Sequence, residues 1–228
     1  MKSTQTLLST YIPYDNFKPT KWRKTHWVTW IFGIAFALLS YSFLRRLAET
    51  LRPDFQPNPL HLQTPTLERF WATLILVVIV AIVLAIHELI HAVFLYYFTG
   101  RFPSLVVGGG GLAIRLPGWY IPRNQFLTAN LAPFIVITLT GVLLLPAVPQ
   151  RYISWTVFLT AMNMAGSIAD IFSSAYLFLH PPSIYLETEG TIYFDENAKP
   201  NSVSAWKNRV RSLFESAIDK LDPQNGTG

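Results

Sequence analysis

One stretch of the sequence limits the possible folds more than any other: residues 70–98 form an apolar run of 29 residues. A helix needs roughly 20 such residues to cross a lipid bilayer, so this run is long enough to span one. Its only charged or imidazole side chains are His87, Glu88 and His91. Ionisable groups are costly at membrane depth, so these three residues indicate a functional site.

These three residues form the pattern His-Glu-x-x-His. Helix positions i and i+4 lie about 40° apart, so His87 and His91 can bind one metal ion together. Glu88 is displaced by about 100°, which favours contact with a metal-bound water over ligation of the metal itself. In the alternative interpretation, the three side chains only pack between helices and form hydrogen bonds with their neighbours.

Composition sets the class of protein. Hydrophobic residues make up 51% of the 228 residues and charged residues only 14%, against about 25% charged residues in soluble domains. The chain has no cysteine, so a metal must bind to nitrogen and oxygen ligands. The net charge of +5 comes without a basic stripe interleaved with aromatic residues, so we expect no nucleic-acid partner.

The apolar residues are concentrated in four long stretches, and these predict an all-α polytopic membrane protein with four transmembrane helices. The predicted helices cover residues 27–44, 70–98, 126–148 and 152–179. A polar N-terminal segment precedes them and a tail follows them. The three predicted parts of the chain are thus residues 1–26, 27–180 and 181–228.

Two segments outside the predicted helices carry further patterns. Between the second and third spans, two short β-prone pieces flank four glycines at residues 108–111, which predicts a β-hairpin; a flexible connector is the alternative. In the tail, residues 202–221 have the apolar stripe of an amphipathic helix. That helix either lies on the membrane surface or docks on the transmembrane domain.

The distribution of basic residues predicts the orientation of the chain. Residues 1–26, 99–125 and 181–228 together hold 13 of the 18 Lys and Arg residues. Because cytoplasmic loops are enriched in Lys and Arg, we expect both termini and the 99–125 loop to face the cytoplasm. Arg45 and Arg46 are exceptions to this distribution.

A catalytic zinc normally takes three protein ligands, of which His87 and His91 supply two. Of the 13 acidic residues, only Glu88 and Asp170 lie within the predicted spans. Spans two and four cross in the same direction, and His87 and Asp170 lie 17 and 18 residues from the starts of their spans. The two side chains are therefore expected at nearly the same depth, which favours Asp170 as the third ligand.

Two neighbours of Asp170 and one rival pair complete the candidates. Asn163 and Ser167 lie on about the same helical face as Asp170, where they could orient the ligand or hold a substrate carbonyl. An ordinary interhelical hydrogen bond is an equal alternative for Asn163. Glu215 and Asp219 have the E-x-x-x-D spacing of soluble gluzincin peptidases, but they lie on the polar side of the tail helix, where such pairs are usually solvated.

The sequence HELIH in a membrane span, a glycine-bearing extended loop and N-x₆-D in a later span together resemble the site-2 protease group of intramembrane metalloproteases. More narrowly, the chain resembles the bacterial "putative zincin peptidase" membrane proteins. The resemblance covers about residues 68–180 and implies zinc held by His87, His91 and Asp170, with Glu88 as general base. The chain departs from the site-2 protease pattern at Ile171, where that group has Gly, and it lacks that group's Pro between the Asn and the Asp.

These features predict a zinc metallopeptidase in a bacterial cell membrane, with the lipid bilayer and a membrane-embedded or membrane-proximal protein substrate as its partners. Gly109 and Gly110 would let the hairpin backbone approach an unwound substrate closely. The alternative is a non-enzymatic metal-binding membrane protein or a divalent-metal/proton transporter. Against a transporter, the sequence shows no internal repeat.

Overall fold

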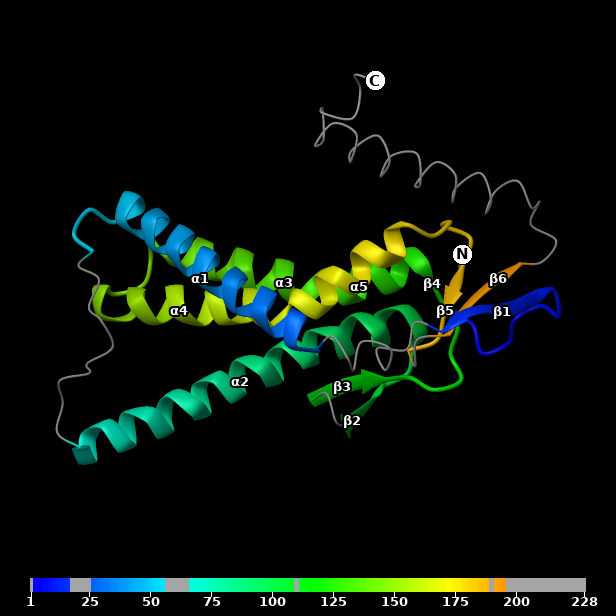
Figure 1. Cartoon of the computed structure of the whole chain (residues 1–228), viewed down its shortest axis with the longest axis horizontal. Coiled ribbons are helices and arrows are strands. Elements are labelled where there is room, and N and C mark those ends of the chain that lie inside the picture. Colours follow the sequence, from blue (N-terminus) through cyan, green and yellow to red (C-terminus); the bar gives the residue numbers. More distant parts are fainter. Residues whose placement is uncertain (1, 17–25, 56–65, 109–110, 189–190, 196–228) are drawn as a thin grey trace, which may run out of the picture.

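The computed structural model describes residues 2–16, 26–55, 66–108, 111–188 and 191–195, and all structural statements below concern these residues. They form a helical bundle with two small antiparallel sheets near one end (Figure 1). The helices are α1 (His26–Leu51), α2 (Thr66–Thr99), α3 (Arg123–Leu144), α4 (Gln150–Gly166) and α5 (Ile168–Phe178).

Three of these helices are long and apolar enough to cross a membrane. The apolar parts run over Ile31–Leu51 of α1, Thr73–Thr99 of α2 and Arg123–Leu144 of α3. Their large hydrophobic side chains are widely exposed, as in Leu39 and Val77. A water-soluble protein rarely exposes so much contiguous apolar surface, so these helices indicate a membrane protein.

The predicted single helix over residues 152–179 is wrong in one respect, because the chain breaks there into α4 and α5. The break lies at Ser167, directly after Gly166, and Gly/Ser pairs are a common cause of helix kinks. The Ser167 hydroxyl and the Ser167 backbone N–H both donate to the Asn163 carbonyl over 2.9 Å. A serine hydroxyl bonded to the carbonyl four residues earlier often bends a helix. Neither helix alone has the length of a span, although together they run along the bundle (Figure 1).

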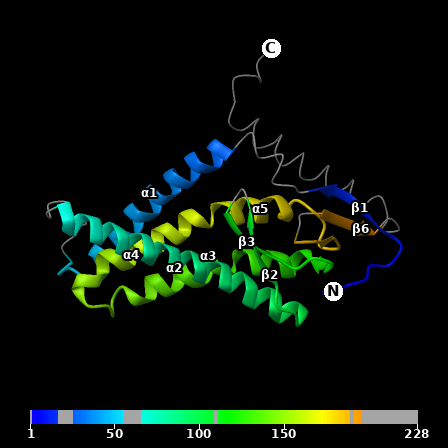
Figure 2. The same ribbon diagram turned by 90° about the horizontal axis from the view of Figure 1, so that it is seen from below.

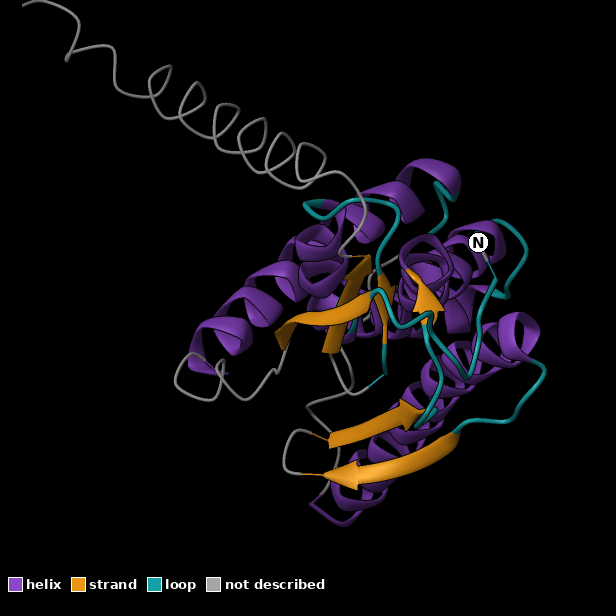
Figure 3. Ribbon diagram, turned by 90° about the vertical axis from the view of Figure 1, so that its right-hand side faces the viewer, coloured by secondary structure: helices purple, strands orange, loops and turns teal. Residues whose placement is uncertain are grey.

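The predicted hairpin is confirmed. Strands β2 (Ser104–Gly108) and β3 (Gly111–Arg115) pair antiparallel, with Gly108 opposite Gly111. Ile114 of β3 packs against the buried cluster around Leu95, so the hairpin is fixed beside the C-terminal part of α2 (Figure 3). Gly100 ends that helix in the left-handed conformation, at φ +69°. Gly109 and Gly110 lie outside the described residues.

A second sheet was not predicted. Its strands are β1 (Tyr11–Asn16), β4 (Ile121–Pro122), β5 (Tyr185–Leu186) and β6 (Thr191–Asp195), in the order β1-β6-β5-β4. β1 contains Pro13, but this strand pairs only with β6 within the sheet, and its register shifts after Pro13. A proline is tolerated at such an edge position. The predicted tail helix, with Glu215 and Asp219, lies outside the described residues.

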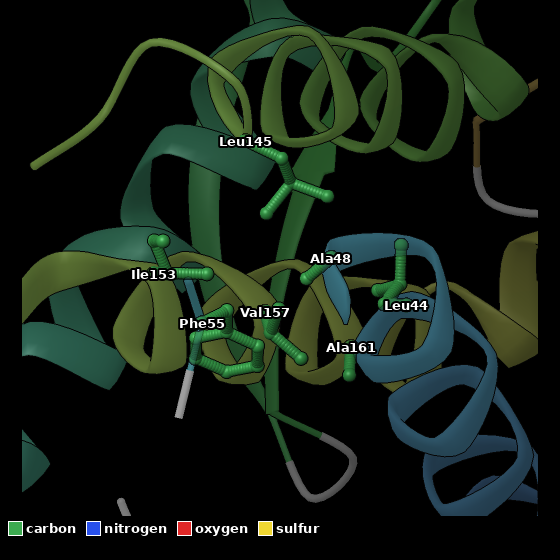
Figure 4. Close-up of a cluster of buried hydrophobic side chains, with 7 residues drawn as sticks. All are labelled: Leu44, Ala48, Phe55, Leu145, Ile153, Val157 and Ala161. Atoms are coloured by element: carbon green, nitrogen blue, oxygen red, sulfur yellow. The ribbon is translucent and has the colours of Figure 1, made fainter. Parts of the chain in front are cut away.

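Two buried clusters hold the ends of the bundle. At one end, side chains from α1, α4 and the chain after α1 and α3 pack together (Figure 4): Leu44, Ala48, Phe55, Leu145, Ile153, Val157 and Ala161. At the other end, Leu127 and Leu177 pack against Ile184, Leu186 and Ile192, which fastens the four-stranded sheet to α3 and α5. The first strand, the hairpin and the last strands therefore lie near the same end of the bundle (Figures 1 and 2).

Candidate metal centre

Three of the predicted site residues meet between α2 and α5. His87 Nε2 lies 3.2 Å from His91 Nε2 and 3.1 Å from Asp170 Oδ2, and His91 Nε2 lies 3.6 Å from the same carboxylate oxygen. All three side chains are largely buried, with the His87 side chain 7% exposed and that of Asp170 20%. One turn of α2 thus presents two imidazoles to the first turn of α5, as the i and i+4 spacing predicts.

The spacing of these three atoms matches a zinc site. Zinc binds imidazole nitrogen and carboxylate oxygen at about 2.0–2.2 Å in tetrahedral geometry, which places ligand atoms about 3.3–3.6 Å apart. The observed distances of 3.1 and 3.2 Å are slightly shorter than this range, and the third, 3.6 Å, lies at its upper limit. The residues therefore fit a zinc ion as a group of two nitrogens and one oxygen.

A backbone carbonyl fixes the tautomer of His91. Its Nδ1 lies 2.8 Å from the Ala129 carbonyl oxygen in α3. A carbonyl can only accept a hydrogen bond, so Nδ1 carries the proton and donates it. In the neutral imidazole, Nε2 is then left with its lone pair directed toward His87 and Asp170. Such an outer hydrogen bond is the usual support of a metal-binding histidine.

The tautomer of His87 is fixed through Asn163. The Asn163 amide nitrogen donates to the Pro133 carbonyl over 3.4 Å, so its oxygen is the atom that faces His87. That oxygen lies 3.0 Å from His87 Nδ1 and accepts a hydrogen bond from it, so Nδ1 carries the proton. His87 Nε2 is therefore also a lone-pair donor to a metal. Asn163, which is 1% exposed, forms an interhelical hydrogen bond and supports a candidate ligand through the same amide.

These two tautomers bring three electron-rich atoms together at the centre. Two imidazole lone pairs and a carboxylate oxygen converge with both Nδ1 protons already engaged elsewhere. Three acceptors at this distance repel one another unless a cation lies among them, either a metal ion or protons on the imidazoles. The chemistry of the donor set therefore fits a divalent metal.

Helix α3 supplies none of these three side chains but contacts all of them directly or through a neighbour. The Asn130 amide donates toward the Asp170 carbonyl and the hydroxyls of Ser173 and Ser174, at 2.8–2.9 Å. These bonds hold the first turn of α5, where the helix dipole favours a carboxylate. Asn130 was not predicted as a site residue, although an amide inside an apolar span is a signal that could have found it.

The remaining predicted site residues take different places. Glu88 is part-buried and directly follows His87 on α2, and its carboxylate interacts electrostatically with His87, His91 and Asp170. Ser167 is fully buried and donates to the Asn163 carbonyl, so it lies at the helix break. Gly109, Gly110 and the rival Glu215 lie outside the described residues. The catalytic and substrate roles of these residues stay predictions.

The fold and site together define a helical membrane protein with a buried two-histidine, one-carboxylate centre. Residues 80–185 match the model of a family described as "Putative zincin peptidase". The match includes all three candidate ligands and Glu88, supports a zincin-like family, and indicates metallopeptidase activity with zinc. Comparisons with the curated proteins and with the solved structures gave no match.

Proposed function

We propose that this protein is an integral-membrane zinc metalloendopeptidase of the site-2 protease type, cutting membrane-embedded or membrane-proximal proteins. The observation that carries the proposal is the convergence of His87, His91 and Asp170 inside a bundle of membrane-length helices. Polar groups of this kind are too costly there to serve packing alone. The match to a zincin family supports the same reading.

In this proposal His87, His91 and Asp170 would hold a zinc ion through two imidazole nitrogens and one carboxylate oxygen. A bound zinc ion would supply Lewis-acid chemistry, polarising the scissile carbonyl and lowering the pKa of a water molecule to about 7. The Ala129 carbonyl and the Asn163 amide keep the two imidazoles in the ligating tautomer.

Glu88 is the proposed general base. It accepts a proton from the attacking water and passes that proton to the leaving amine, so one peptide bond and one water become a carboxylate and an amine. Its position beside the three candidate ligands, one residue after His87, supports this role. The carboxylate is only part-buried, which suits a group that must meet both water and substrate.

The depth of the centre supports a membrane substrate. Exposed aromatic side chains gather at the end of α2, with Tyr97 80% and Phe102 77% exposed, as in the aromatic belt of a membrane interface. His91 and His87 lie six and ten residues before Tyr97, so about 9 and 15 Å from it along the helix axis. Water and an unwound segment of substrate can both reach that depth.

The hairpin is the proposed substrate-holding element. Strand β3 is fixed beside α2, close to the centre, and strand pairing would hold an unwound substrate extended. The glycines between β2 and β3 would permit close backbone approach. The proposed location is a bacterial cell membrane with both termini cytoplasmic. The gathering of β1, the hairpin and β6 near one end of the bundle supports a common side for these segments, and the distribution of Lys and Arg favours the cytoplasmic side.

A transport function is favoured by one observation, the helix break beside Asp170, because discontinuous helices form the ion sites of many transporters. The two functions separate in sealed vesicles. The peptidase proposal predicts cleavage of a membrane protein substrate by the wild type, no cleavage by Glu88→Gln, and no zinc flux by either. Zinc flux without cleavage would favour the transporter.

A further inference from the structure

We infer that Pro133 is a positioning residue of the metal centre, acting on both histidines through two backbone carbonyls of α3. It frees the Ala129 carbonyl for His91, and its own carbonyl orients the Asn163 amide that holds His87. The inference rests on the proposed metal site, but it does not depend on the peptidase reaction.

The first carbonyl is freed by the chemistry of proline. Pro133 lies inside α3 and has no backbone N–H, so the carbonyl four residues earlier, that of Ala129, loses its usual helical donor. Ala129 is buried, and a buried carbonyl without a partner is costly. His91 Nδ1 supplies the missing donor at 2.8 Å. His91 thus gives the Ala129 carbonyl a hydrogen-bond donor, and the same hydrogen bond fixes the orientation of the imidazole.

The second carbonyl is that of Pro133 itself. It accepts from the Asn163 amide nitrogen over 3.4 Å, in a fully buried setting. An Asn side chain can flip its oxygen and nitrogen, and only one orientation presents an acceptor to His87 Nδ1. The Pro133 carbonyl selects that orientation. A single residue of α3 is therefore linked to the ligating tautomer of both His87 and His91.

A positioning role and a merely structural role predict different results for a substitution of Pro133. In a positioning role, zinc affinity falls while the stability of the metal-free protein does not. A proline in a helix interior weakens the helix, so replacing it by alanine should leave the stability of the metal-free protein unchanged or raise it. The same replacement creates an N–H at position 133 that competes with His91 for the Ala129 carbonyl. Zinc binding should therefore weaken in a protein that is at least as stable.

The test uses the full chain in detergent or nanodiscs. For Pro133→Ala we expect zinc affinity, measured by competition with a chelator, to fall 10- to 100-fold, the usual effect of losing outer support. Nitrogen NMR of the metal-free protein should show the His91 proton leaving Nδ1. Ile135→Ala, at an exposed position of the same helix, is the matched control. It should change neither the zinc affinity nor the position of the His91 proton.

A second variant distinguishes the N–H from the ring. Lactic acid at position 133 lacks both the ring and the N–H, so it should keep zinc affinity near that of the wild type, even if Pro133→Ala folds poorly. Wild-type affinity and an unchanged His91 tautomer in Pro133→Ala would overturn the inference, as would a lactic-acid variant as weak as the alanine one. A wild type that binds no zinc would refute the proposed function, and the His91 tautomer would then decide the inference alone.

Discussion

Asp170 is the ligand whose replacement gives the most informative result. Asp170→Asn is nearly isosteric and leaves the first turn of α5 in place, but it exchanges a carboxylate for a neutral amide 3.1 Å from His87 Nε2. Structural zinc sites are worth roughly 10–16 kcal/mol. Shared evenly over four ligands, one ligand accounts for about 2.5–4 kcal/mol, or roughly 10²- to 10³-fold in affinity.

The assay is competitive zinc titration of the purified protein, with metal content measured in parallel. Asp54→Asn is the matched control, because Asp54 forms an ion pair with Arg52 on an exposed loop away from the centre. We expect that control to bind zinc like the wild type and the zinc affinity of Asp170→Asn to fall roughly 10²- to 10³-fold. Full zinc affinity in Asp170→Asn, with loss in Glu215→Ala, would refute this ligand set and favour the tail residues.

Four further predictions rest on the sequence and the described residues together. Glu88→Gln removes a proton acceptor but no ligand, so it should give a folded, zinc-loaded and inactive protein; retained cleavage would move the base elsewhere. Replacing Gly109 and Gly110 by Val should impair cleavage of a membrane substrate at unchanged zinc content, and unaltered cleavage would reduce the glycines to a linker. A reporter fused after residue 228 should be cytoplasmic, and an external reporter would reverse the topology. Burial, followed by the charge of Glu187, raises the pKa of Tyr193 to about 12. Because the unfolded pKa is about 10, Tyr193 should make folding stability fall as pH rises from 10 to 12, and Tyr193→Phe should lessen that fall.

The sequence pattern predicted the three side chains that meet at the centre. The spacing of His87 and His91 on one face of α2 follows from helical periodicity, and Asp170 stood out because carboxylates are rare in apolar spans. The hairpin was predicted from β-prone residues on either side of a glycine run. Each of these features is a property of local sequence.

Most of the remaining features depend on tertiary contacts that local sequence does not encode. Pro133 marks the Ala129 carbonyl as one that lacks its helical donor, but only the fold could show that His91 donates to it. Strands β4 and β5 have two residues each and form because distant segments pair. The helix break was the avoidable error, since Gly166 and Ser167 together signal a kink.

The most direct test of the central claim is zinc K-edge X-ray absorption on the purified full-length protein, with zinc counted per chain. We expect one zinc per chain, bound by two imidazole nitrogens and oxygen ligands at about 2.0–2.2 Å. His91→Ala should abolish this signal. A wild type that carries no zinc after purification and reconstitution, or one whose spectrum lacks imidazole ligands, would contradict the assignment of His87, His91 and Asp170.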